Sequence, residues 1–311
     1  MQKVLEPTGR QHPQKPEPAL SPLTLNSDSR KNTHTAFGRP RAFLNNRFVY
    51  AVISQRAGGL SIGVNMNPDK RCNFDCPYCE VNRDAAPLDQ KVDLRIMTAE
   101  LENLLALSHQ KKLCELPWFR NLPEELLQLK EVALSGDGEP THCPNFTEVV
   151  REVVYVRSKG KFPFFKIVLI TNSTGLHLSE VKHGVQLLTT RDEIWAKLDA
   201  GTQEYMGKVN GGEATLKKVI ANILQTARER PIVIQSLFPS INGEEPPREE
   251  IEEYVQRLQE LKSAGAQISM VQVYSAHRPP HRSDCGHLPL KTLSQIARRV
   301  REVTGLKAEV F

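Results

Sequence analysis

The alternation of short apolar runs with helical patterns constrains the fold of this 311-residue chain more than any other feature. Apolar runs rich in β-branched residues, which are typical of buried strands, occur at 60–64, 131–134, 164–170, 194–198, 232–237 and 268–274. Patterns of helical period lie between and after them, at 98–109, 122–129, 145–158, 178–188, 214–228, 247–263 and 290–303. Strands that are each followed by a helix form a parallel sheet with the helices packed outside it.

The number of these strand-helix units predicts an α/β fold of a particular kind. A complete barrel of eight units takes about 250 residues, and here six units occupy a similar length. We therefore expect a partial (β/α)6 barrel with long loops, the longest at about 80–130 between the first two strands. Pro246 and Pro247 suit a helix start, and Gly265 and Gly305 suit helix ends.

The N-terminal region has a different composition. The first 40 residues contain six of the 21 prolines and a single aromatic residue, Phe37. Such a segment buries too little apolar surface to offset the entropy of ordering it. We expect a flexible, disordered extension over 1–44 and one folded domain over 45–311. Residues 1–40 have six Lys and Arg against three Asp and Glu, so more than half of the net charge of +5 belongs to them.

Hydropathy and cysteine content indicate the cellular compartment in which the protein is found. No apolar stretch approaches the roughly 18 residues that span a bilayer, and the N-terminus has no apolar segment of a secretory signal. The sequence therefore predicts a soluble, cytoplasmic protein with no membrane partner. In that setting six cysteines favour metal ligands, catalytic thiols or buried apolar residues over disulfides.

Three cysteines follow the first predicted strand in one short loop. Cys72, Cys76 and Cys79 have the spacing Cys-x3-Cys-x2-Cys, and Tyr78 directly precedes the third. A tight loop can direct three thiolates toward one point, where each ligates one iron of a cubane cluster. The fourth iron then lacks a protein ligand and can bind a small molecule.

Two alternatives to the cluster remain open. A structural zinc site in a binding protein would use the same three cysteines, but zinc sites usually close with four ligands and contain Cys-x2-Cys pairs. A fourth ligand would have to come from Cys114, Cys143 or Cys285, none of which lies in a paired motif. The other alternative is three unrelated thiols.

The loop resembles the signature of the radical S-adenosylmethionine (SAM) enzymes at Cys72, Cys76, Tyr78 and Cys79. The resemblance implies a 4Fe-4S cluster on the three cysteines, with SAM bound to the fourth iron through its amino and carboxylate groups. In that family the reduced cluster cleaves SAM to a 5′-deoxyadenosyl radical, which abstracts a hydrogen atom from the substrate. It also implies an electron donor such as flavodoxin or ferredoxin, and a place for the Tyr78 region against the adenine.

The second predicted strand ends in Gly136, Asp137, Gly138 and Glu139. The glycines allow the backbone to approach a ligand closely, and the Glu139 carboxylate offers an acceptor for an ammonium group. The segment resembles the Gly-Gly-Glu motif that holds the methionine amino group in radical SAM enzymes. We therefore expect these four residues at the SAM site.

Polar residues also end the next three strands. Asn172 and Ser173 either cap a helix or, by the resemblance, contact SAM. Lys197 and Asp199 are two residues apart, so both side chains project to one face, toward the barrel interior. They form either a structural salt bridge or a contact with SAM or substrate, because buried charges are costly unless paired or used. Gln235 is either a ribose ligand or satisfied core polarity.

The last candidate site residues lie on the sixth predicted strand and in the loop after it. By the resemblance, Val271 and Val273 would flank the adenine. The loop at 277–287 is dense in His and Arg and contains Cys285. It is compatible with a substrate site, a hydrogen-donating thiol, a second metal site or a solvated loop.

The motifs together look most like the wyosine-synthase-related group of radical SAM proteins, over about residues 55–275. Enzymes of that name build a tricyclic base on tRNA and have upstream cysteines for a second cluster. No cysteine precedes Cys72 here, which argues against a second cluster and against the tRNA reaction. The near-neutral folded part also argues against a nucleic-acid substrate. The Gly-Glu-Pro segment is shared with glycyl-radical activating enzymes, so the unidentified substrate is a small molecule, a protein or an RNA.

Overall fold

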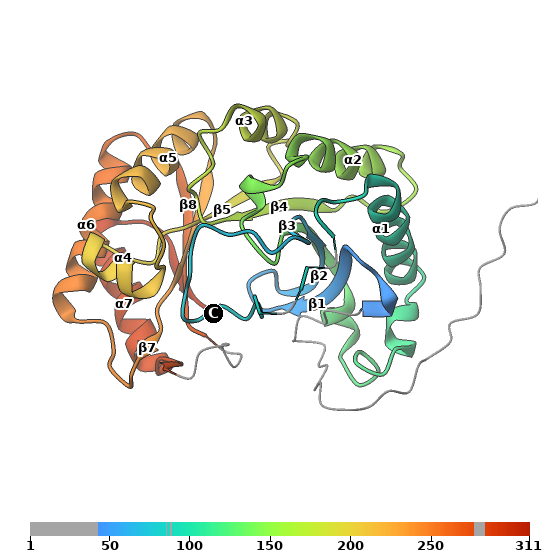
Figure 1. Ribbon diagram of the computed structural model, residues 1–311. Coiled ribbons are helices and arrows are strands. Elements are labelled where there is room, and N and C mark those ends of the chain that lie inside the picture. The colour runs from blue at the N-terminus through green and yellow to red at the C-terminus, as the bar shows by residue number, and fades with distance from the viewer. Residues whose placement is uncertain (1–42, 85, 88, 277–283) are drawn as a thin grey trace, which may run out of the picture. The chain divides into compact units, whose positions relative to one another are not determined.

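Eight strands form one sheet in the order β1-β2-β3-β4-β5-β6-β8-β10 (Figure 1). The computed structural model describes residues 43–84, 86–87, 89–276 and 284–311. Six strands pair in parallel in chain order, and they are the six that the sequence predicts: β2 (Gly59–Asn65), β3 (Leu129–Ser135), β4 (Lys166–Thr171), β5 (Glu193–Lys197), β6 (Ile232–Leu237) and β8 (Ile268–Tyr274). The predicted α/β fold, a partial barrel with a parallel sheet inside and helices outside, is confirmed.

Two strands extend this sheet at its edges. β1 (Val49–Ser54) pairs antiparallel to β2, and β10 (Ala308–Val310) pairs parallel to β8. A separate two-stranded pair joins β7 (Ser240–Ile241) to β9 (Cys285–Gly286). The sequence pattern missed all four strands. β7, β9 and β10 are too short to show a period, and β1 alternates buried with half-buried residues instead of forming a continuous apolar run.

Helices cover the outer side of the strands (Figure 1). They are α1 (Leu94–His109), α2 (Phe146–Ser158), α3 (Ser179–Gln186), α4 (Gln203–Val209), α5 (Leu216–Glu229), α6 (Arg248–Ser263) and α7 (Leu290–Thr304). Local chemistry sets their ends. The Asp93 side chain accepts hydrogen bonds from two backbone N–H groups at the start of α1. Pro247 and Pro289 directly precede α6 and α7. Gly305 ends α7 in the left-handed conformation.

One helix that the sequence predicts is nearly absent. The segment 122–129 contains only a short 3-10 helix at Glu124–Leu127. Leu129 already belongs to β3 and pairs with Leu60 of β2, so the backbone must be extended where the helical pattern would have continued. Three further 3-10 turns lie at Phe43–Asn45, Lys112–Glu115 and Pro140–His142.

Strand alternation separates an outer core from an inner one. On β5, Ile194 and Ala196 belong to the main hydrophobic core beneath the helices, as does Leu198 just after the strand. Trp195 points the other way and packs with Val168 and neighbouring inner residues in a second cluster. Lys197 shares the inner side with Trp195, as the sequence predicts.

The predicted extension over 1–44 lies almost wholly outside the described residues. Of its last two residues, Phe43 is 1% exposed, and its ring centroid lies 5.8 Å from that of Trp118 and 6.2 Å from that of Phe119. Over the described ranges, no helix is both long and apolar enough to cross a membrane.

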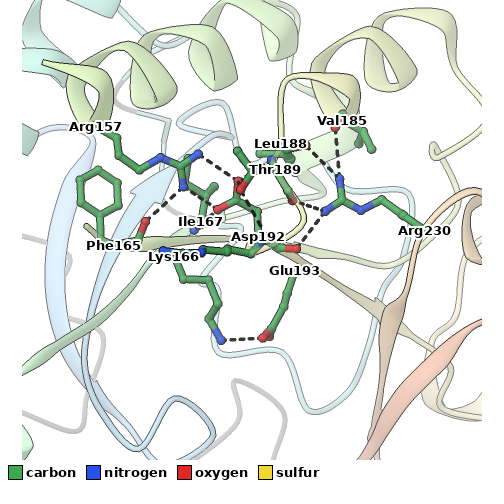
Figure 2. Close-up of polar contacts among 11 residues, drawn as sticks. Arg157, Phe165, Lys166, Ile167, Val185, Leu188, Thr189, Asp192, Glu193 and Arg230 are labelled. Carbon is green, nitrogen blue, oxygen red and sulfur yellow. Dashed lines mark hydrogen bonds and ion pairs between the residues drawn. The ribbon is translucent and has the colours of Figure 1, made fainter. Parts of the chain in front are cut away.

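A buried ionic network ties the amino ends of the central strands together (Figure 2). Arg157 of α2 forms a two-pronged pair with Asp192, whose carboxylate also accepts from the backbone N–H of Ile167 at 2.8 Å. Arg230 donates to the carbonyl oxygens of Thr189 and Asp192 at 2.9 Å each. The network lies at the opposite strand ends from the polar motifs described next.

Candidate functional site

The cysteine loop begins directly after β2, at the carboxyl edge of the parallel sheet. Cys72, Cys76 and Cys79 are all partly exposed and none forms a disulfide. Phe74, between the first two, is buried in the main core and fixes the loop to the barrel. The three thiols therefore lie on one anchored loop that remains open to solvent.

The Gly136–Glu139 segment packs against this loop. The Glu139 N–H donates to the Arg71 carbonyl at 2.9 Å, and the Asn67 amide donates to the Glu139 carbonyl at 2.9 Å. A Cβ on Gly138 would lie 1.8 Å from the Arg71 carbonyl oxygen. The glycine is therefore required by loop packing, whether or not it also approaches a ligand.

Asp137 and Gly136 are held in a similar way. The Asp137 carboxylate accepts from the Asn65 amide at 2.8 Å, and the Asp137 N–H donates to the Asn65 side-chain oxygen at 2.9 Å. A Cβ on Gly136 would lie 2.4 Å from the Asn67 side-chain oxygen. The ends of β2 and β3 are thus bound to each other side by side.

The Glu139 carboxylate is buried, at 2% exposure, and its acceptor capacity is used within the protein. It accepts from the Thr141 N–H at 3.1 Å, from the Thr141 hydroxyl at 2.6 Å and from the Thr171 hydroxyl. The Asn172 N–H donates to its second oxygen at 2.6 Å. Glu139 therefore joins the ends of β3 and β4, a role that the sequence did not reveal.

Asn172 and Ser173 continue the same edge at the end of β4. The Asn172 amide donates to the Asn73 side-chain oxygen at 2.8 Å, and its nitrogen lies 3.9 Å from the Cys72 sulfur. Ser173 is fully buried with a φ of 70°, and its hydroxyl donates to the Lys197 carbonyl at 3.2 Å. Asn172 faces the cysteine loop, whereas Ser173 joins β4 to β5.

Lys197 and Asp199 form a salt bridge with each other, which is one of the two roles that the sequence allowed for them. The ammonium nitrogen lies 3.3 Å from the Asp199 carboxylate and 3.1 Å from the Tyr274 hydroxyl. It also lies 5.2 Å from the ring centroid of Tyr78 and 5.4 Å from that of Tyr274, within cation–π range. Burial opposes the charge, but Asp199, Tyr274 and Cys76 together outweigh it, and the pKa of Lys197 is raised. The lysine is a cation, not a nucleophile.

Asp199 accepts hydrogen bonds from several directions. Tyr78 donates to it at 2.5 Å, the Asn210 amide at 2.8 Å and the Leu237 N–H at 2.9 Å. Burial and the adjacent Asp199 carboxylate raise the pKa of Tyr78 well above its usual value. The tyrosine therefore acts as a neutral donor at physiological pH.

Gln235 lies on the inner face of β6 and is 2% exposed. Its amide donates to Gln272 at 3.1 Å, and its oxygen accepts from the Tyr274 hydroxyl at 3.2 Å. The Gln272 side-chain nitrogen is buried and has no hydrogen-bond partner among the described residues. Lys197, Tyr274 and Gln235 thus form one connected polar network on three neighbouring strands.

Val271 and Val273 do not lie on this inner face. Both are fully buried in the main core beneath the helices, while Tyr274 faces inward. The expectation that their side chains flank a bound adenine was wrong, because strand alternation directs them to the helix side.

The other cysteines do not join the loop. Cys143 is buried and Cys114 is exposed, with its thiol 3.0 Å from the Lys111 carbonyl oxygen. Cys285 is buried in β9, and residues 277–283 of the predicted 277–287 loop lie outside the described residues. In the part of the chain that the structure describes, no three His, Cys, Asp or Glu side chains are grouped to hold a single metal ion.

A segment that the sequence did not single out also lies against the cysteine loop. Asn210, Gly211 and Gly212 follow α4, and the Asn210 carbonyl accepts from the Asp75 N–H at 2.7 Å. Gly212 has a φ of 75°, and a Cβ there would lie 2.1 Å from the Asn73 carbonyl oxygen. The Asn-Gly-Gly run after a short helix was the available signal for this close approach.

Sequence comparison finds distant relatives. A UPF0026 protein of Synechocystis sp. is 24% identical over 163 residues, which is 52% of this chain and 52% of the relative. A UPF0026 protein of Helicobacter pylori is 26% identical over 153 residues, which is 49% of this chain and 42% of the relative. The chain therefore spans about half the length of these curated relatives. No family model matches it.

Solved structures share the fold over most of the chain. Streptococcus suis SuiB bound to S-adenosylmethionine has a TM-score of 0.54 at 13% identity, covering 83% of this chain and 52% of SuiB. A spore photoproduct lyase with bound AdoMet and dinucleoside spore photoproduct has a TM-score of 0.53 at 10% identity, covering 84% of this chain and 78% of the lyase. Both are radical SAM enzymes. The chain has the fold of the radical SAM family.

Proposed function

We propose that this protein is a radical SAM enzyme that binds one 4Fe-4S cluster through Cys72, Cys76 and Cys79. The observation that carries the proposal is the position of the three-cysteine loop. It follows the first parallel strand of a radical SAM fold, at the sheet edge where Asn172 and Lys197 also lie. Ligands of barrel enzymes bind at that edge.

The residues present fit such a cluster. Three thiols from one anchored loop match the number that leaves one iron free. The amide nitrogens of Asn172 and Asn210 lie 3.9 Å and 3.6 Å from the sulfurs of Cys72 and Cys76, the arrangement that supports iron-sulfur ligands. When bound, the cluster supplies the electron that cleaves SAM to a 5′-deoxyadenosyl radical.

The chain's own residues would bind and orient SAM. The Lys197 ammonium, at the carboxyl end of β5, has the charge that would bind a carboxylate. The Glu139 hydrogen bonds hold the ends of β3 and β4 to each other. The residues proposed to form the SAM site are Tyr78, Gly136, Asp137, Gly138, Glu139, Asn172, Ser173, Lys197, Asp199 and Gln235.

Anaerobic reconstitution tests the proposal directly. Full-length protein should bind about four iron and four sulfide per chain, and dithionite with SAM should release 5′-deoxyadenosine. Cys76→Ala should lose both properties because one iron loses its ligand. Cys114→Ala, which removes an exposed thiol outside the loop, should retain both. Cluster assembly and SAM cleavage by Cys76→Ala would overturn the proposal.

The zinc alternative predicts a different metal content. Protein purified anaerobically would then contain one zinc per chain and no iron-sulfur absorption. For the radical SAM function, we propose that a flavodoxin or ferredoxin supplies the electron. The substrate, whether a small molecule, a protein or an RNA, is best sought as the compound that accelerates 5′-deoxyadenosine release.

A further inference from the structure

Asn210 contacts a cluster cysteine and the SAM-facing polar network at the same time. It ends α4 and is 3% exposed. Its side-chain nitrogen lies 3.6 Å from the Cys76 sulfur, 2.9 Å from the Tyr78 hydroxyl and 2.8 Å from the Asp199 carboxylate. In the part of the chain that the structure describes, these are its three side-chain contacts.

The Asn210 backbone fixes this position. Its N–H donates to the Met206 carbonyl at 2.8 Å, which completes the last turn of α4. Its carbonyl accepts from Asp75 in the cysteine loop at 2.7 Å, and the glycines that follow allow the two backbones to touch. The side chain is therefore held against Cys76 by bonds that do not depend on a bound ligand.

We infer that Asn210 is a positioning residue that raises the reduction potential of the bound cluster by donating an N–H···S hydrogen bond to the Cys76 thiolate. The inference rests on the proposed function. Reduction adds negative charge to the cluster and its sulfur ligands, and an N–H dipole directed at a sulfur stabilises that charge. Asn210 has two N–H groups for three neighbours, so one can donate to the thiolate while the other remains on Asp199. The Tyr78 hydroxyl needs neither, because it donates its own proton to Asp199.

The test is a potentiometric titration of the reconstituted full-length protein, followed by electron paramagnetic resonance of the reduced cluster. Asn210→Ala removes the N–H, and its midpoint potential should shift to more negative values. Asn210→Asp puts a carboxylate near the sulfur and should shift it further. The matched control is Asn222→Ala, which removes a buried amide that donates to the carbonyls of Ser173 and Thr174 at 2.9 Å each and not to a sulfur. Its potential should equal that of the unmodified protein.

The outcomes separate the inference from the proposed function. If the unmodified protein assembles no 4Fe-4S cluster, the proposed function fails. If it assembles the cluster and cleaves SAM, but Asn210→Ala and Asn210→Asp titrate at its potential, only the inference is overturned. Asn210→Ser serves as a milder variant. Loss of the cluster from all three Asn210 variants, with retention in Asn222→Ala, would assign Asn210 a purely structural role and overturn the tuning role.

Discussion

Two buried ionisable side chains in this barrel meet the cost of burying a charge in opposite ways. Lys197 is paired with Asp199 and placed between two tyrosine rings, so its charge is retained. Among the described residues, Glu131, on the inner face of β3, accepts one hydrogen bond, from the Ser61 hydroxyl at 3.1 Å, and its second oxygen accepts none. Burial raises the pKa of Glu131 to about 7.

Glu131 should make stability depend on pH. Between the ordinary pKa of 4.5 and the folded value of about 7, the folded protein binds a proton that the unfolded chain has released. The free energy of unfolding should therefore fall as pH rises across this window, by about 3 kcal/mol in total at ~1.4 kcal/mol per pKa unit. Glu131→Gln is neutral at every pH and should lack this loss.

Urea denaturation at pH 5 and pH 8 checks this prediction. Relative to the unmodified protein, Glu131→Gln should be more stable at pH 8 than at pH 5 by about 2.5 kcal/mol. Glu125→Gln, at an exposed carboxylate, should show no such difference. Equal effects of Glu131→Gln at the two pH values would contradict it.

At the scale of elements, the site is assembled where strand ends and loops touch. Gly138 brings the β3 end onto the cysteine loop, and Gly212 brings the α4–α5 loop onto it from another direction. Each approach is too close for a Cβ. The loop is thus fixed by backbone contacts from two elements.

Gly212→Ala should separate close packing from backbone strain. Gly212 and Gly243 both have positive φ, but a Cβ at Gly212 meets the Asn73 carbonyl oxygen at 2.1 Å, whereas one at Gly243 meets nothing within 4 Å. Gly243→Ala should cost on the order of 1 kcal/mol, from strain alone. Gly212→Ala should cost more and should also lower the iron retained per chain, because the loop must move.

Iron analysis after reconstitution and urea denaturation measure these two effects. Full iron retention in Gly212→Ala, with a stability loss no larger than that of Gly243→Ala, would show that the contact is not needed to hold the loop.

For the whole molecule, the proposed site and a stabilising ionic network lie at opposite ends of the parallel strands. The proposed site occupies the carboxyl ends, and the network of Arg157, Asp192 and Arg230 occupies the amino ends (Figure 2). In Asp192, hydrogen bonds from Arg157 and from the Ile167 and Thr189 N–H groups outweigh burial and lower its pKa. Asp192 therefore contributes stability that is lost only as pH falls through that lowered value.

Arg157→Met should destabilise the fold without changing the chemistry. It leaves the Asp192 carboxylate, whose side chain is fully buried, without its cation. Removing one partner of a buried pair costs about 3–5 kcal/mol. Iron content and SAM cleavage should be unchanged at temperatures where the variant is folded.

The matched control is Glu204→Gln, which breaks an exposed Lys208–Glu204 pair within one helix and should leave the melting temperature nearly unchanged. Loss of cluster binding in folded Arg157→Met would show that the two ends of the barrel are coupled.

The sequence by itself determined the six parallel strands and the carboxyl-edge motifs, because periodicity and cysteine spacing are local. It also placed Lys197 inside the barrel, since alternation along one strand settles which face a side chain takes. It did not determine which polar groups pair with one another. Glu139 joins Thr171 across 32 residues of sequence, and Asn210 lies against Cys76 across 134. Only the tertiary structure decides such contacts, because the register between strands and the approach of loops are set by packing of the whole barrel.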